Sequence, residues 1–157
     1  MKAVLIVIGR TTDRRLQELT DDYVERISHY MPFSIDVIPE LRQTKALSPE
    51  QQKAAEADML RTRLQLGDRL VLLDEHGTER RSMEFARWLQ KRLAAGGRRL
   101  VFVVGGPYGF DTSIHDLADE EISLSQMTFS HQLIRLLMVE QLYRANTILR
   151  GEPYHHE

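Results

Sequence analysis

The feature that most constrains the fold is a regular alternation of short apolar runs with amphipathic segments along the whole chain. Most of the runs are rich in valine, isoleucine and leucine and lack a polar face, which is typical of strands covered on both sides. The segments between them repeat apolar residues at helical spacing. We expect strands at residues 4–8, 33–38, 69–73, 100–104 and 122–124, and helices at 13–30, 48–67, 82–93, 113–117 and 129–149. This order predicts an α/β fold with a mainly parallel sheet of five to six strands and helices on both faces.

Length and composition suit one hydrophobic core. With 157 residues and 42% hydrophobic content, we expect a single domain over residues 1–157. The chain has no cysteine, which removes disulfides, thiolate zinc sites and thiol nucleophiles. No apolar run approaches the roughly 20 residues needed to cross a bilayer, and the run at residues 3–8 does not have the pattern of a secretion signal. We therefore expect a soluble, cytoplasmic protein with no membrane partner.

The charge balance limits how the chain could bind nucleic acid. A formal net charge of -2 and a pI near 6.3 argue against binding through overall positive charge. Basic pairs occur at Arg14-Arg15, Arg80-Arg81, Lys91-Arg92 and Arg98-Arg99. Each is more often a solvated helix or loop face than a binding patch. A role with RNA would therefore depend on a local patch.

A glycine-rich loop follows the expected strand at residues 100–104. Gly105, Gly106 and Gly109 stand within five residues of one another, so the backbone could approach a bound molecule without a side chain in the way. In parallel sheets, ligands bind beyond the carboxyl ends of the strands, which here means the loops after Leu73, Val104 and Leu124. A plain tight turn is the alternative interpretation of the glycines.

The last expected helix is apolar nearly all round. At 100° per residue, Leu133 and Leu137 lie on one side, while Val139, Leu142 and Tyr143 point well away from it. Such a helix must be covered nearly all round, which favours a homodimer built on it. The alternative is a helix enclosed within its own domain.

The search for familiar catalytic motifs is mostly negative. The chain has no dinucleotide-binding Gly-x-Gly-x-x-Gly, no phosphate-binding loop and no Gly-x-Ser-x-Gly turn. The adjacent His155 and His156 would point in different directions, so no metal site is expected. The remaining candidate is a loop-made pocket for a cofactor that brings its own reactivity, and S-adenosylmethionine fits that description. Composition alone does not select it over a nucleotide or another small anion.

Several blocks in the last third of the chain carry a family resemblance. They are 105–109, 124–131, Arg135, Glu140, 142–145 and 153–155. In these blocks the chain resembles the RlmH family, small bacterial methyltransferases of the SPOUT class that methylate N3 of a pseudouridine in large-subunit ribosomal RNA. The resemblance implies a C-terminal trefoil knot, a homodimer with cofactor pockets at its interface, S-adenosylmethionine as cofactor and ribosomal RNA within the ribosome as substrate.

The resemblance also implies roles for individual residues. The cofactor pocket would be lined by Leu72, Leu73, Gly105, Gly106, Gly109, Leu124, Ser125, Gln126, Met127, Thr128 and Phe129. The RNA would be contacted by His131, Arg135, Tyr143 and His156, and the catalytic residues would be His155, Arg144 and Tyr154. Relatives are expected to carry a basic residue where this chain has His156.

A mechanism follows from the chemistry of the implied acceptor. A ring imide N–H is a poor nucleophile until its proton leaves, so a base or a cation that stabilises the imidate should help. We expect His155 to accept the proton and Arg144 to hold the negative oxygen. Simpler interpretations exist: His131 could begin its helix, Glu140 and Arg144 could form an ordinary ion pair, and Tyr143 could be packing.

Two other functions compete with this prediction. One is a non-catalytic α/β module that binds a nucleotide or S-adenosylmethionine as a signal. The other is a related methyltransferase that acts on transfer RNA. Tyr154 and His155 favour an enzyme over a sensor, because a sensor has little use for an imidazole beside its pocket.

Overall fold

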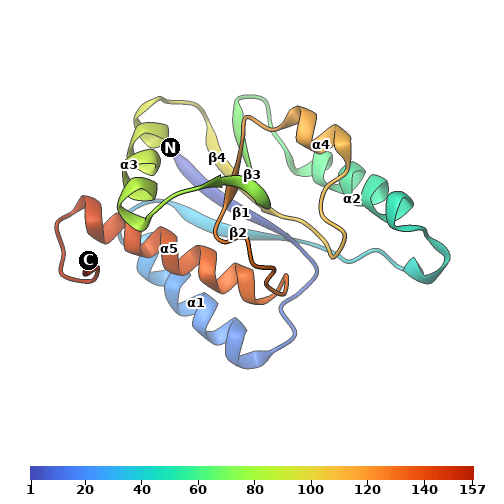
Figure 1. The fold of residues 1–157 in the computed structure, drawn as a ribbon, viewed down its shortest axis with the longest axis horizontal. Coiled ribbons are helices and arrows are strands. Elements are labelled where there is room, and N and C mark those ends of the chain that lie inside the picture. The colour runs from blue at the N-terminus through green and yellow to red at the C-terminus, as the bar shows by residue number, and fades with distance from the viewer.

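A five-stranded parallel sheet forms the centre of the computed structural model, which describes all 157 residues (Figure 1). The strand order is β2-β1-β4-β3-β5, and every pair of neighbours is parallel. The strands are β1 (Lys2–Ile8), β2 (Phe33–Ile38), β3 (Asp68–Glu79), β4 (Arg99–Val104) and β5 (Glu120–Ser123). The helices are α1 (Arg14–Ser28), the short 3-10 helix η1 (Thr44–Ala46), α2 (Pro49–Arg63), α3 (Ser82–Ala94), α4 (Thr112–Leu117) and α5 (Leu133–Leu149). The predicted parallel α/β fold is confirmed, with five strands.

Alternate residues of the central strands point into two separate cores. On β4, Leu100, Phe102 and Val104 pack with residues of α1, α3 and α5, whereas Val101 and Val103 pack with residues of α2 and α4. Figure 1 shows the same arrangement, with α1, α3 and α5 on one face of the sheet and α2 and α4 on the other. Because both faces are covered, the central strands need apolar residues at every position, as their sequences indicate.

Two helices begin where side chains can satisfy their first free N–H groups. The Asp13 carboxylate accepts from the amides of Arg15 and Leu16 at the start of α1. At α2, Ser48 Oγ accepts from the Gln51 amide at 3.1 Å, and Gln51 Oε1 accepts from the Ser48 amide at 2.9 Å. The capping box predicted at Ser48 is thus confirmed.

Strand β3 is longer than the sequence predicts. It extends to Glu79 rather than ending at Leu73, and its pairing with β5 shifts register between Leu73 and Thr78. The extension is polar, so it lacks the apolar signal of a buried strand. It wraps along the edge strand β5, and a Cβ at Gly77 would lie 2.7 Å from the backbone of that strand.

Helix α5 lies between α1 and α3, on the face of the sheet that those helices cover (Figure 1). Met138, Val139, Leu142 and Ala145 are buried there within the chain's own core. Most of the apolar surface of α5 is therefore explained by burial within its own chain. The apolar character of this helix does not by itself support a homodimer.

The chain passes from one face of the sheet to the other after β5. It leaves α4 beside α2, forms β5 at the sheet edge next to β3, and continues into α5 on the opposite face (Figure 1). The resemblance places the trefoil knot in this region, and the threading of the knot stays a prediction. No helix of the structure combines the length and apolar character that a membrane crossing requires.

An ion pair joins helix α3 to the edge of the sheet. Glu120 of β5 accepts from Arg92 Nη2 at 2.7 Å and from Trp88 Nε1 at 3.1 Å. The hydrogen bonds from Arg92 lower the pKa of Glu120. A carboxyl group whose folded-state pKa is lowered stabilises the fold above its unfolded pKa, and this contribution is lost as the pH falls through the folded value.

We therefore expect Glu120→Gln to lower the free energy of unfolding at pH 7 by about 1 kcal/mol. The difference from the wild type should shrink between pH 7 and pH 3, as acid begins to protonate the wild-type carboxyl. Urea denaturation of both proteins at the two pH values measures this. A difference that is the same at pH 3 and pH 7 would show that the charge of Glu120 does not contribute.

Candidate functional site

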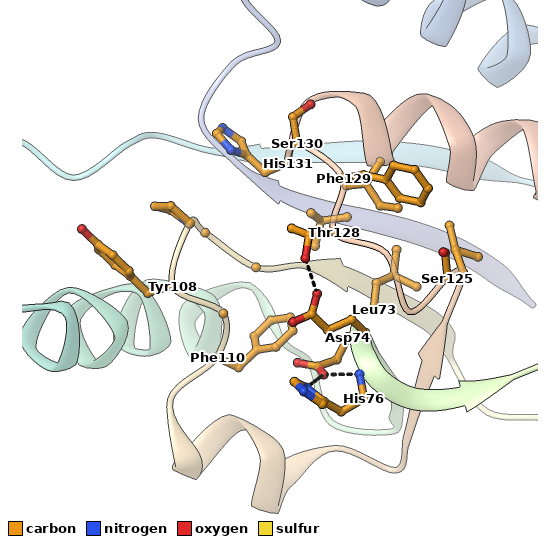
Figure 2. Close-up of a pocket in the computed structure, with 18 of the residues that line it drawn as sticks. Leu73, Asp74, His76, Tyr108, Phe110, Ser125, Thr128, Phe129, Ser130 and His131 are labelled. Carbon is orange, nitrogen blue, oxygen red and sulfur yellow. Dashed lines mark hydrogen bonds and ion pairs between the residues drawn. The ribbon is translucent and has the colours of Figure 1, made fainter.

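A bulged stretch of β3 and the loops after β4 and β5 line a cavity of about 500 Å³ (Figure 2). The stretch of β3 begins at Leu73, and the two loops follow Val104 of β4 and Ser123 of β5. The sequence predicts a ligand site at these three places. The cavity is lined by residues 73–76, 104–110, 124–125 and 127–131, and by Ile134.

The structure brings most of the predicted cofactor residues to this cavity. Those on its wall are Leu73, Gly105, Gly106, Gly109, Leu124, Ser125, Met127, Thr128 and Phe129. Leu72 does not reach it: its side chain is fully buried in the core beneath α2, because successive strand residues point to opposite faces. Gln126 is exposed and also lies outside the lining.

Side-chain hydrogen bonds hold the loop after β5 in shape. Ser123 Oγ donates to the Ser125 carbonyl at 2.9 Å, and Ser125 Oγ accepts from the Met127 amide at 3.0 Å. Thr128 Oγ1 donates to Glu75 Oε2 at 2.8 Å, which ties this loop to the end of β3 (Figure 2). Ser123 and Ser125 therefore hold the backbone of this loop, and Thr128 joins the loop to β3.

Carboxylates are the only side chains of fixed charge on the cavity wall. Asp74 and Glu75 line it, and no lysine or arginine does. Asp74 Oδ1 accepts from the backbone amide of His76 at 2.8 Å and lies 3.0 Å from its Nδ1 (Figure 2). An anionic ligand such as a phosphorylated nucleotide would meet unfavourable charge here, whereas a neutral or cationic ligand would not.

Several lining residues are not among the sequence-based candidates. They are Asp74, Glu75, His76, Tyr108, Phe110, Ser130 and Ile134. The run Asp-Glu-His directly after the apolar run of β3 was the available signal, since it puts polar side chains at the carboxyl end of a strand.

Two residues predicted to contact RNA have different surroundings. His131 lines the cavity. Arg135 is 2% exposed, and its guanidinium donates to the carbonyls of Ile8 and Gly9 at 2.8 and 2.9 Å and to that of His131 at 3.0 Å. The N–H groups of Arg135 are therefore bonded inside the protein and are not free to contact RNA. Arg135 has a structural role instead of the predicted RNA contact. Burial lowers the pKa of Arg135.

The other predicted substrate and catalytic residues gather at the far end of α5. We call Glu140, Tyr143, Arg144, Tyr154 and His155 the terminal cluster. Glu140 Oε1 accepts from Arg144 Nη2 at 2.6 Å and from the Tyr154 hydroxyl at 3.1 Å. The Tyr143 ring packs edge-on against that of Tyr154, with centroids 4.8 Å apart, which favours the packing interpretation of Tyr143. His156 lies next to the cluster and is exposed.

The contact between Arg144 and His155 determines which ring nitrogen of His155 carries the hydrogen. Arg144 Nη1 lies 3.1 Å from His155 Nδ1. A guanidinium can only donate, so Nδ1 must accept and the ring hydrogen must be on Nε2. That Nε2–H is buried and has no hydrogen-bond partner. In this arrangement His155 presents a donor, and its predicted role as a proton acceptor stays a prediction.

The Tyr154 hydroxyl is also held in its protonated form. Burial, the hydrogen bond with Tyr23 and the charge of Glu140 all raise the pKa of Tyr154. Its hydroxyl lies 3.1 Å from the Tyr23 hydroxyl and donates to Glu140. Tyr154 is therefore a fixed donor and anchors the chain terminus against α1 and α5.

The terminal cluster and the cavity lie apart within one chain. Ile134 lines the cavity and Arg144 stands ten residues further along α5, which corresponds to about 15 Å of helix. A second cavity of about 230 Å³ shares Leu124 and Phe129 with the first and reaches Glu140, but Arg144, Tyr154 and His155 do not line it. Neither cavity is lined by Arg144, Tyr154 or His155 of the same chain.

The fold and the cavity together define a class of protein. This is a parallel α/β protein with a cavity of ligand size at the carboxyl edge of its sheet. The chain belongs to the SPOUT methyltransferase family, because the model described as "Predicted SPOUT methyltransferase" matches residues 1–155. The family makes the chain an enzyme that uses a methyl donor.

Relatives match over the full length of the chain. A protein of Bacteroides fragilis named "Ribosomal RNA large subunit methyltransferase H" is 57% identical over all 157 residues, which are 100% of both chains. A protein of the same name from Phocaeicola vulgatus is 55% identical with the same coverage. Among solved structures, a probable methylase family protein from Haemophilus influenzae aligns with 95% of this chain and 66% of its own, at 12% identity and a TM-score of 0.49. That similarity is too small to add to the assignment.

Proposed function

We propose that this chain is an S-adenosylmethionine-dependent methyltransferase that acts on N3 of a pseudouridine in 23S ribosomal RNA of the assembled ribosome. The observation that carries the proposal is the 57% identity, over the whole chain, to a relative named for methylating large-subunit ribosomal RNA. Identity of this extent covers every loop of the cavity and the terminal cluster. The place of action would be the cytoplasm, where ribosomes are found.

The cavity suits S-adenosylmethionine in size and charge. Its volume of about 500 Å³ lies within the range of cofactor sites. Asp74 and Glu75 complement a positive sulfonium, and the glycine loop offers backbone without side-chain obstruction. The cofactor, when bound, supplies a methyl group already activated by its sulfonium. The residues of this chain would bind it, orient it and exclude water.

A homodimer would bring the terminal cluster to the cavity. Within one chain the two lie about 15 Å apart along α5. Large apolar side chains are exposed beside the cavity, Met127 at 74% and Tyr108 at 53%. Such side chains at a rim are typical of a surface that is covered in the functional state. We propose that a second copy covers the rim and presents its own Arg144 and His155 there.

The terminal cluster is suited to stabilise negative charge on the acceptor base. Arg144, held by Glu140, supplies a fixed cation, and His155 supplies a buried Nε2–H without a partner. Both would donate to the oxygen that becomes negative when the imide loses its proton. The N3 proton would leave to a solvent water or hydroxide, and a bound methyl donor would supply the methyl group that N3 takes up, with the thioether as leaving group.

A methyl-transfer assay tests the proposed function. The protein is incubated with labelled S-adenosylmethionine and, separately, with ribosomal subunits, assembled ribosomes, naked ribosomal RNA and transfer RNA. We expect label in the assembled ribosome and much less in naked RNA, because a chain of net charge -2 gains little from RNA phosphates alone. Label in transfer RNA would indicate the related enzyme, and tight cofactor binding without any transfer would indicate a sensor.

A further inference from the structure

A buried carboxyl group lies directly behind the glycine loop of the cavity. Glu56 of α2 is 6% exposed, and its Oε1 has no hydrogen-bond partner. Its Oε2 accepts one long bond, from Gln52 Nε2 at 3.4 Å. The side chain is in no ion pair, and burial raises its pKa, which favours the neutral acid. Nothing in the proposed methyl transfer uses this group.

The carboxyl group occupies the space that a side chain at position 106 would need. A Cβ added to Gly106 would lie 2.5 Å from Glu56 Oε2 and 2.6 Å from Oε1. The φ angle of Gly106 is not positive, so its backbone conformation does not itself require glycine. A side chain at 106 would therefore have to push the Glu56 carboxyl group, the end of a flexible side chain, out of its present position.

Gly109, at the other end of the loop, is favoured as glycine for a different reason. Gly109 has a φ of +82°, in the left-handed region, and a Cβ there would meet nothing within 4 Å. The loop closes through a hydrogen bond from the Gly109 amide to the Gly106 carbonyl at 3.1 Å. One end of the loop is therefore set by backbone conformation, and the other by contact with Glu56.

An unpaired, buried acid is unfavourable for folding, and a nonpolar or amide side chain would fill the same place on α2 at less cost. Buried polar groups without partners call for an explanation, and groups with shifted pKa values cluster at functional sites. Of the functional segments, the loop at residues 105–109 is the one in contact with it, and this loop lines the proposed cofactor site.

We infer that Glu56 is a positioning residue that holds the loop at residues 105–109, from behind, in the conformation that binds the methyl donor. The inference rests on the proposed cofactor site, and it goes further by assigning a role to a side chain that does not line that site. Glu56 and Gly106 act as a matched pair: the absence of a side chain on one makes room for the carboxyl group of the other.

A double-mutant cycle tests the pair. The dissociation constant for S-adenosylmethionine is measured by calorimetry for the wild type, Glu56→Ala, Gly106→Ala and the double variant, with thermal midpoints as a folding check. We expect Gly106→Ala to weaken binding about tenfold and Glu56→Ala about threefold. The double variant should bind more tightly than Gly106→Ala alone, because removing the carboxyl group makes room for the methyl group.

Gly109→Ala is the matched control. It should weaken binding through backbone strain, and adding Glu56→Ala should not restore affinity, since no atom of Glu56 lies within 4 Å of a Cβ placed on residue 109. A double variant of Gly106 and Glu56 whose loss equals the product of the two single losses would overturn the inference.

Amide hydrogen exchange separates this inference from the proposed function. Without any cofactor, Glu56→Ala should speed exchange at residues 105–110 and leave α5 unchanged. If the wild type bound no S-adenosylmethionine, the proposed function would be wrong. The exchange rates would still show whether Glu56 holds the loop. Unchanged exchange at residues 105–110 would show that Glu56 does not hold the loop.

Discussion

Replacing Arg144 by alanine is expected to lower the rate of methyl transfer about 100-fold or more while leaving the affinity for S-adenosylmethionine nearly unchanged. Arg144 is fixed by two bonds to Glu140, at 2.6 and 3.1 Å, and in turn faces His155 Nδ1. Its charge is therefore positioned before the acceptor base arrives. Because none of its atoms lines the cavity of its own chain, its loss should affect the chemical step rather than cofactor binding.

Single-turnover transfer to ribosomes, measured beside calorimetric cofactor binding, tests this expectation. Arg150→Ala is a suitable control, since Arg150 lies at the end of the same helix and only stacks on Tyr30. That variant should keep nearly full activity. An Arg144→Ala enzyme with wild-type transfer rates would remove the terminal cluster from the mechanism.

The donor role of His155 makes a finer prediction. Glutamine can present an N–H close to the position of Nε2 but cannot act as a base, so His155→Gln should retain more activity than His155→Ala. The rates of both variants, measured on ribosomes, decide the point. If His155→Gln were as inactive as His155→Ala, the imidazole would be needed as a proton acceptor after all.

Replacing Arg135 by methionine is expected to lower the free energy of unfolding by about 3–5 kcal/mol. The guanidinium joins the end of β1 to the start of α5 through three main-chain carbonyls, those of Ile8, Gly9 and His131. Methionine fills much of the volume but leaves these buried acceptors without a donor. The same change should weaken cofactor binding, because His131 ends the loop that lines the cavity.

Denaturant titration of Arg135→Met against the wild type measures the stability change. The matched control is Arg14→Met, since the side chain of Arg14 is 89% exposed and pairs only with Glu18. This surface variant should differ from the wild type by less than about 0.5 kcal/mol. A loss below about 1 kcal/mol for Arg135→Met would show that water replaces the missing donors, and that the link between β1 and α5 is dispensable.

Much of the fold could be predicted because local signals agree with one another. The apolar runs give the strands, the capping box at Ser48 gives the start of α2, and the glycines after β4 mark the cavity. The polar end of β3 could not be found this way, since it pairs with an edge strand and has no buried face. Its residues Asp74 and Glu75 supply the charge of the cavity.

The surroundings of individual side chains were harder to foresee. Arginine is seldom fully buried, so the internal role of Arg135 required knowledge of the carbonyls at the end of β1. The tautomer of His155 likewise depends on a guanidinium eleven residues away in sequence. Leu72 and Leu73 differ only in which face of the sheet they point to, which a resemblance between sequences does not resolve.

Methyl transfer in this protein should require two chains, one binding the donor and the other presenting its terminal cluster. Mixing two inactive variants tests this: Gly105→Val, whose side chain would press on Phe110 in the cavity wall, and Arg144→Ala. After equal amounts are unfolded and refolded together, half of the dimers contain both variants and each of these has one intact site, so about a quarter of wild-type activity should return. Full inactivity of the mixture, with both variants folded and associated, would show that one chain does not complete the site of another.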